Sequence, residues 1–387
     1  SNHDFATGSE SNIGLATYTT SDNTWAYLTS SSTGTISSGT GYAVKLASAG
    51  DISFLGTMKV DDASVDLTTS GSNGFNLLGN PYLASVSVGE LLGANNSGLA
   101  EQTVWLWDQA SDTYVQKNLI EDFEIAPSQG FFVKASSSGT FDITESMQSH
   151  SSDTFQRPST RPEIELTMTD GTDTRRADIF YIEGTTTGFD NGYDSSIFEG
   201  AANEFAIYTH AVANGNGRNL GIQSLPPDNY ENMIIPVGIN AVSETDIIID
   251  ASTVNLPIGM NVYLEDKDDN SFTLLDSDSN FTTTLASDLD GIGRFYLHTT
   301  TSTLGAENFE IDNLSIYTSS RENLRIVGVR NGTARVQLYN ILGKEVLRST
   351  FEGTGVNDIQ LPSLGEGIYI VHLSIANGTT NKKIIIE

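Results

Sequence analysis

The sequence of 387 residues contains no cysteine, and its five histidines stand far apart. Because secreted eukaryotic proteins built from β-domains usually carry disulfides, the absence of cysteine points to a cytosolic protein or a bacterial surface protein. No two histidines have the spacing of zinc ligands, and no Gly-x-Ser-x-Gly elbow or other nucleophile signature is present. We therefore do not expect an enzyme.

Basic residues are few, with 19 Lys and Arg against 49 Asp and Glu, which gives a formal net charge of −30. The imbalance is confined to residues 1–309, which hold 11 basic and 41 acidic residues, whereas residues 310–387 hold eight of each. An acidic surface repels nucleic-acid phosphates and anionic membranes, so we expect neither as a partner.

Long apolar runs are also absent. No stretch approaches the length of a transmembrane helix, so we expect no transmembrane segment. The chain begins with SNHDFATGSE, without Met and without a signal peptide. We therefore expect a mature form or the tail of a longer chain.

Good helix formers rarely follow one another, while Gly, Ser, Thr, Asn and Asp are abundant. This composition favours short strands joined by many turns. One short helix is expected, in ASVSVGELLGA (Ala84–Ala94). The sequence predicts an all-β fold made of consecutive β-sandwich domains of jelly-roll or immunoglobulin-like type.

Two polar segments divide the chain into three regions. Ser149–Pro162 is rich in Ser and Thr and carries two prolines, and Thr299–Asn313 has a similar composition where the charge balance changes. We predict a first region at residues 1–150, a second at 151–305 and a third at 306–387.

The first region contains an internal repeat. GYAVKLASAGDISF begins at Gly41 and GFFVKASSSGTFDI at Gly130, and each copy follows a tryptophan-containing segment. We interpret the repeat as two similar hairpins within one sandwich. Trp25, Trp105 and Trp107 either stack on sugars or belong to the core of this region.

The second region shows apolar alternation in segments about ten residues apart, as in jelly rolls and related sandwiches. Ile164, Leu166 and Met168 share one face of the first segment, and Asp170-Gly171 then predicts a hairpin turn.

Acidic loops in the second region are the only candidates for a metal site. Asp276, Asp278 and Asn280 alternate as calcium ligands do, but the Gly and Glu that an EF-hand requires are replaced by Phe281 and Ser287. Phe189–Asp194 also gathers carboxylates. Acidic turns between strands explain both segments equally, and no other cofactor is expected.

The third region predicts about seven short strands, the number and length of a small immunoglobulin-like sandwich. In its final hairpin Tyr369, Val371 and Leu373 share one face, while Ile368 and Ile370 lie on the other. Asn377-Gly378 is a strong signal for the turn.

This region resembles the C-terminal sorting domain, of the cleavable type A kind, of proteins exported by the type IX secretion system of Bacteroidetes bacteria. The resemblance rests on LYNILGKEVL, LPSLGEGIYIVHL and the closing KKIIIE, in this order over about 75 residues. The Asn-Pro usual after the first strand is replaced by Thr318–Ser320. The residues that match the family motifs are Leu338, Tyr339, Gly343, Lys344, Gly367, Tyr369, Val371, Lys382 and Lys383.

The resemblance implies a route and a set of partners. Such cargo crosses the outer membrane through a large barrel translocon, and an outer-membrane shuttle barrel and a surface protease act next. The destination is the cell surface or the extracellular medium. GFNLLGNPY, APSQGFFVKA and RFYL also look like modules of large flavobacterial surface proteins, some of them adhesins linked to gliding.

Three functions remain open from the sequence. The first is the C-terminal portion of an adhesin-like surface protein, and the second is a set of carbohydrate-binding modules of a secreted polysaccharide-degrading enzyme. The third treats residues 306–387 as an accessory domain without a role in export. Lys382 and Lys383 either protect a strand edge or contact a partner.

Overall fold

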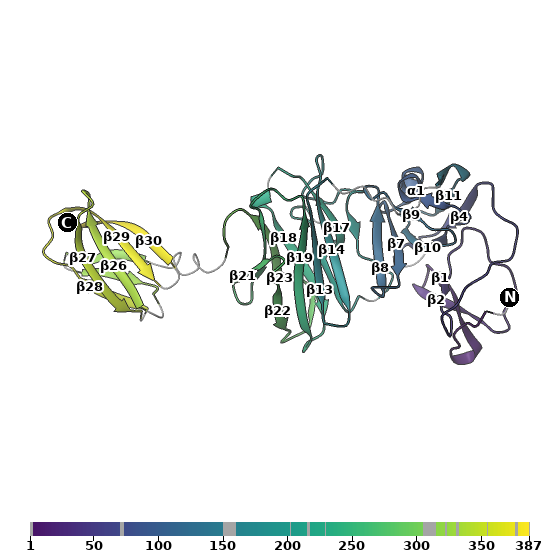
Figure 1. Ribbon diagram of the computed structural model, residues 1–387, viewed down its shortest axis with the longest axis horizontal. Helices are drawn as coiled ribbons and strands as arrows, with labels where there is room; N and C mark the ends of the chain where they lie inside the picture. The colour runs from purple at the N-terminus through teal and green to yellow at the C-terminus, as the bar shows by residue number, and fades with distance from the viewer. Residues whose placement is uncertain are drawn as a thin grey trace. The chain divides into compact units, whose positions relative to one another are not determined.

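The computed structural model describes the whole chain except residues 1–2, 70–72, 150–159, 202, 215–216, 229, 305–314, 322, 330–332, 354, 376–377 and 387. Both predicted linkers and the Asn377-Gly378 turn thus lie largely outside the described residues. Strands dominate throughout (Figure 1), as the all-β prediction requires. No described helix has the length and apolar character needed to cross a membrane.

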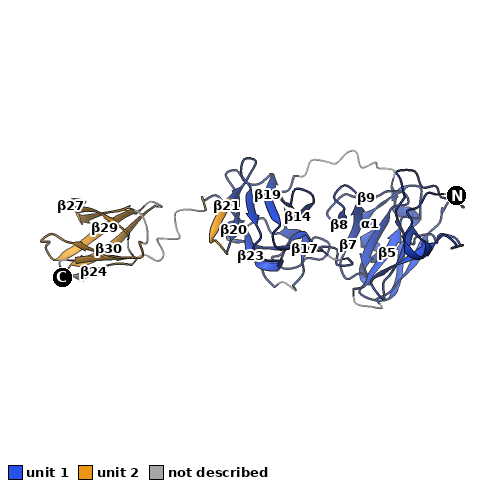
Figure 2. Ribbon diagram, turned by 90° about the horizontal axis from the view of Figure 1, so that it is seen from below, with its two compact units in different colours: residues 1–267, 274–302 blue, residues 268–273, 303–387 orange. Residues whose placement is uncertain are grey.

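The chain divides into two compact units (Figure 2). One comprises residues 1–267 and 274–302 and includes both the first region and nearly all of the second. The other comprises residues 268–273 and 303–387 and contains the third region.

The first region is built from several small sheets. Their orders are β2–β1–β3, β5–β10–β7–β8, β11–β4 and β12–β6–β9. The helix begins where the Ser87 hydroxyl accepts a hydrogen bond from the Glu90 amide, at 3.5 Å. The elements are η1 (Ser9–Ser11), β1 (Asn12–Thr19), β2 (Thr24–Thr29), β3 (Ala43–Val44), β4 (Ala63–Leu67), β5 (Phe75–Gly79), β6 (Ser85–Ser87), α1 (Val88–Asn95), η2 (Asn96–Gly98), β7 (Thr103–Asp108), β8 (Thr113–Asn118), β9 (Glu124–Ile125), β10 (Gly130–Lys134), β11 (Gly139–Ile143), η3 (Glu145–Met147) and β12 (Gln148–Ser149).

The two copies of the sequence repeat have different structures. The second copy forms β10, which pairs with both β5 and β7, and β11, which pairs with β4. The first copy forms only the two-residue β3, and residues 51–60 after it contain no strand. The shared letters therefore do not encode two equal hairpins.

The second region consists of one large sheet that surrounds a single apolar core. From β20 the strand order is β23–β18–β16–β17–β14–β13–β19–β22, and β15 also pairs with β17. Ile164, Leu166 and Met168 all lie in the core, as predicted. The elements are β13 (Glu163–Thr169), β14 (Thr174–Tyr181), β15 (Ser195–Ser196), β16 (Ala206–Thr209), β17 (Leu220–Leu225), η4 (Tyr230–Asn232), β18 (Ile234–Ala241), β19 (Asp246–Val254), β20 (Asn261–Asp266), β21 (Ser271–Leu275), β22 (Phe281–Thr284) and β23 (Leu289–Thr300).

The loop at residues 190–198 joins the second region to the first. The Trp105 indole donates a hydrogen bond to the Ser196 carbonyl at 2.9 Å, and the Thr103 hydroxyl donates to the Ser195 hydroxyl at 2.9 Å. Phe198 packs in one buried cluster with Phe75 and Trp105. The two regions therefore share part of their core.

The third region is a sandwich of two sheets, with orders β24–β25–β28 and β27–β26–β29–β30. These seven strands of the described chain match the predicted number. Tyr369, Val371 and Leu373 face the core, while Ile368 and Ile370 are exposed. The strands are β24 (Ser315–Ser320), β25 (Asn323–Val327), β26 (Thr333–Asn340), β27 (Glu345–Glu352), β28 (Val356–Gln360), β29 (Gly367–Ile375) and β30 (Gly378–Ile386).

Candidate functional site

Two surfaces of the described chain can carry function: one end of the third region and a pocket in the larger compact unit. In the third region the motif residues fall on three adjacent strands and one turn. Leu338 and Tyr339 end β26, Gly343 and Lys344 lie in the β26–β27 turn, Gly367, Tyr369 and Val371 belong to β29, and Lys382 and Lys383 belong to β30.

Several motif residues hold the sandwich together. Leu338 and Val371 are opposite one another on β26 and β29, and both are fully buried. Tyr369 is buried as well, and its hydroxyl donates a hydrogen bond to the Gly365 carbonyl at 2.9 Å. These three side chains are part of the fold rather than of a contact surface.

The β26–β27 turn is organised by Asn340. Its Oδ1 accepts hydrogen bonds from the Leu342 and Lys344 amides, both at 3.0 Å. Gly343 has a φ of +77°, a conformation that glycine adopts at little cost. This turn leaves Ile341 and Leu342 73% and 86% exposed, and we call this pair the apolar tip.

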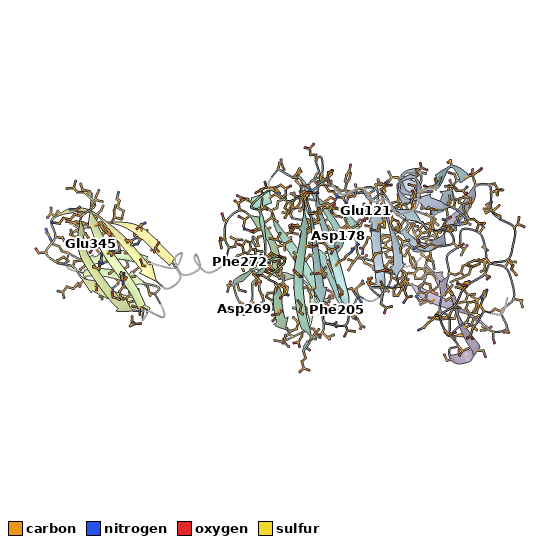
Figure 3. All side chains as sticks on the ribbon, viewed as in Figure 1. Glu121, Asp178, Phe205, Asp269, Phe272 and Glu345 are labelled. Carbon is orange, nitrogen blue, oxygen red and sulfur yellow. The ribbon has the colours of Figure 1, made fainter. Side chains whose placement is uncertain are left out.

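Polar residues surround the base of the same turn. Gln337 Nε2 donates to Glu345 Oε2 at 2.7 Å, and Arg348 donates two hydrogen bonds to the Glu345 carboxylate, at 3.0 and 2.7 Å. The hydrogen bonds from Arg348 hold the pKa of Glu345 below its usual value. Glu345, labelled in Figure 3, is therefore a fixed charge beside the apolar tip.

The two lysines lie on the last strand, β30, which is an edge of its sheet. Both are exposed, and Lys383 is opposite the exposed Ile370 on β29. Their exposure is compatible with either role left open by the sequence.

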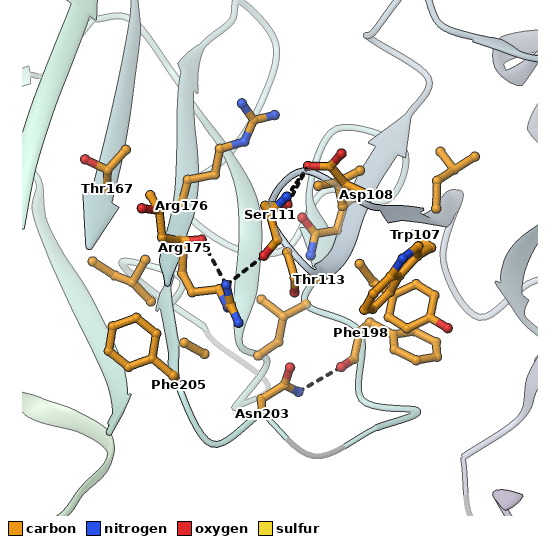
Figure 4. Close-up of a pocket in the computed structure, with 18 of the residues that line it drawn as sticks. Trp107, Asp108, Ser111, Thr113, Thr167, Arg175, Arg176, Phe198, Asn203 and Phe205 are labelled. Atoms are coloured by element: carbon orange, nitrogen blue, oxygen red, sulfur yellow. Dashed lines mark hydrogen bonds between the residues drawn. The ribbon is translucent and has the colours of Figure 1, made fainter. Parts of the chain in front are cut away.

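The pocket lies in the compact unit formed by residues 1–267 and 274–302. Its volume is about 490 Å³, and its walls come from β7–β8, β13–β14 and residues 197–207. We call it the Trp107 pocket. Figure 4 shows Trp107 and Phe198 on one side and Arg175 and Phe205 on the other.

The tryptophans of β7 differ in exposure although they point to the same face of the strand. Trp105 is fully buried, whereas Trp107 is 44% exposed at the pocket. Tyr114 packs edge-on against Trp107, with ring centroids 5.1 Å apart. Burial raises the pKa of Tyr114 to about 12, so its hydroxyl stays neutral. Trp25 packs edge-on against Tyr18 and does not line the pocket.

Charged groups of the pocket are held in place by neighbours. Arg175 NH1 donates to the Ser111 and Thr174 carbonyls at 2.9 and 3.0 Å, and Arg176 NH1 lies 3.2 Å from Glu165 Oε2. The Ser111 hydroxyl donates to Asp108 at 2.5 Å, which lowers the pKa of that carboxyl. These groups offer both donors and acceptors to a ligand.

Two carboxyl groups near the pocket have raised pKa values. Burial raises the pKa of Asp178 to about 6, although Arg176 opposes the shift (Figure 3). Burial likewise raises the pKa of Asp194, in the 190–198 loop, to about 7. Asp194 accepts hydrogen bonds from the Ser224 and Asp190 amides at 2.6 and 2.7 Å, so it supports the loop.

The calcium candidates form a turn. Asp276 and Ser279 are linked by backbone hydrogen bonds, and the Asp278 amide donates to Asp276 Oδ1 at 2.9 Å. Asn280 follows directly in the same loop. Within the described part of the chain, no three His, Cys, Asp or Glu side chains are close enough to hold a metal ion. Turn formation accounts for what these residues do in the structure.

Comparison with known families gives two matches. Residues 312–387 match a family model described as a secretion system C-terminal sorting domain. Residues 112–298 match a model described as a domain of unknown function (DUF8693), and this match crosses the boundary that we predicted at residue 150. No curated protein matches the chain.

Proposed function

We propose that this chain, a type IX secretion cargo with its sorting domain at residues 312–387, is the C-terminal part of an adhesin-like, non-enzymatic surface protein. The sorting domain interacts with the type IX machinery and directs export across the outer membrane, to the cell surface or the extracellular space. The two upstream regions then provide the adhesive surface. The observation that carries the proposal is the sorting domain joined to a unit with an open, aromatic pocket.

Deletion of residues 306–387 tests the export step in cells that have a type IX system. We expect the truncated protein to accumulate in the periplasm, while the full chain reaches the surface or the medium. A reporter fused to residues 306–387 serves as the converse control and should be exported. Surface delivery of the truncated protein would support the accessory-domain alternative instead.

Recognition by the translocon and its shuttle barrel is assigned to the apolar tip and the adjoining edge strand. Exposed large apolar side chains favour protein contacts, and an edge strand offers unpaired backbone groups for strand addition. The balanced charge of residues 310–387 permits docking without the repulsion that the acidic regions would cause.

Two double variants separate the tip from the lysines. Ile341→Ser with Leu342→Ser should abolish export without lowering the thermal midpoint, because both side chains are already in water. Lys382→Glu with Lys383→Glu is the matched variant on the edge. If export survives this second change, the lysines protect the edge; if it is lost in a folded protein, they contact the machinery.

Adhesion itself is tested on cells that display the protein. Cells with the full chain should attach to polysaccharide-coated surfaces more strongly than cells that lack it. Equal attachment would contradict the adhesin-like role.

The second candidate is a carbohydrate-binding part of a polysaccharide-degrading enzyme. Trp107 favours it, because an exposed indole beside polar side chains is suited to stacking on a sugar ring. The two candidates differ in what precedes the first region in the full-length protein. Depolymerisation of a bound polysaccharide by that protein would favour the enzyme.

A further inference from the structure

We propose that the Trp107 pocket binds a neutral pyranose unit of a polysaccharide, with the sugar ring stacked on the Trp107 indole. This inference deepens the proposed function and rests on it, because it names the ligand of the surface-displayed unit. Its volume of about 490 Å³ lies within the range of small-molecule sites.

The stacking surface follows from the packing of Trp107. Tyr114 meets the indole at an interplanar angle of 70°, so the two rings are not stacked on one another. Nearly half of the Trp107 side chain remains exposed. An exposed flat ring of this kind fits the apolar face of a pyranose, which presents C–H groups.

Hydrogen bonding to sugar hydroxyls requires fixed donors and fixed acceptors, because each hydroxyl can act as both. Arg175 supplies donors and is fixed by the Ser111 and Thr174 carbonyls. Asp108 supplies acceptors and is fixed by Ser111, while Asn203 is fixed by donating to the Phe198 carbonyl at 2.8 Å. Their neighbours thus hold these groups in place before a ligand arrives.

The charge balance selects a neutral sugar. The pocket is lined by two cationic residues, Arg175 and Arg176, and by two anionic ones, Asp108 and Glu165, so the sum is zero. Glu165 is also the ion-pair partner of Arg176. An acidic sugar would have no unpaired cationic group here and would be repelled by the net charge of −30.

Titration calorimetry on the full chain provides the test, with cellohexaose, xylohexaose and mannohexaose as neutral probes and oligogalacturonate as the anionic probe. We expect at least one neutral probe to bind with a roughly millimolar Kd, and oligogalacturonate not to bind. Trp107→Ala should weaken binding at least tenfold. Trp107→Tyr should restore part of the affinity, because it keeps a flat ring at this position.

Tyr27→Ala is the matched control, since Tyr27 is an exposed aromatic residue of β2 that does not line the pocket. It should bind like the parent protein. Binding of oligogalacturonate alone, no binding of any neutral probe, or equal affinity of the Trp107→Ala variant would each overturn the inference. If cells still attach to polysaccharide-coated surfaces in that case, the adhesin-like function stands without this site.

Discussion

Trp105 and Trp107 show how much a single residue depends on distant parts of the chain. Both have the same strand parity on β7, so the alternation of the sequence assigns them the same environment. Residues 196–198 cover Trp105 and leave Trp107 exposed. This contact joins positions about 90 residues apart, and no local pattern announces it. The sequence predicted the choice between core and sugar contact, but not which residue takes which role.

The two tryptophans should respond differently to substitution. Trp105→Phe removes the donor to the buried Ser196 carbonyl and should cost about 1–3 kcal/mol of the free energy of unfolding. Trp107→Ala should change it by less than about 0.5 kcal/mol, because the side chain lies at the surface. Urea unfolding measured by circular dichroism compares them. A larger loss for Trp107→Ala would contradict the assignment.

Asp194 predicts a pH dependence. Its pKa is raised from 3.8 to about 7, so between these values the folded state holds a proton that the unfolded state releases. Stability is therefore greatest below pH 4 with respect to this group and falls as the pH rises to 7, by at most on the order of 4 kcal/mol. Asp194→Asn should flatten this decline and gain stability relative to the parent at pH 8. Parallel stability curves from pH 4 to 8 would refute it.

The β26–β27 hairpin shows the same limit at the level of an element. Alternating residues predicted which face of β29 is buried, because a strand with one buried face has a period of two. The apolar tip was missed, since Ile341 and Leu342 look like continuing core residues. The available signal was their position between Asn340 and Gly343, two residues typical of turns.

Gly343 gives the corresponding prediction. Gly343→Ala places a side chain at a φ of +77° and should cost about 1–2 kcal/mol. Gly365→Ala is the matched control, because Gly365 also has open space around it but no left-handed backbone. Thermal unfolding by far-ultraviolet circular dichroism measures both variants. Equal midpoints would show that the turn conformation adds no strain.

At the level of the whole molecule, composition predicted the fold class well. The scarcity of helix formers and the many turn residues led to an all-β chain, and the described strands confirm it. The core shared by Phe75, Trp105 and Phe198 could not be predicted, because it depends on the insertion of one loop. The pocket next to it was unpredictable for the same reason.

Unfolding should proceed in two separable transitions, one for each compact unit. The three tryptophans lie in the first region, so indole fluorescence follows only the unit that contains it. Deletion of residues 306–387 should remove one calorimetric transition and leave the fluorescence midpoint unchanged. A shift of that midpoint would show that the two units stabilise one another.

The even charge of residues 310–387 has a practical consequence for biochemical work. Their eight basic and eight acidic residues cancel, so their removal leaves the net charge of −30 as it was. Proteolytic trimming at the cell surface would therefore alter the mass of the protein while hardly changing its retention on an anion-exchange column. Mature and untrimmed forms will copurify by charge and must be told apart by mass spectrometry.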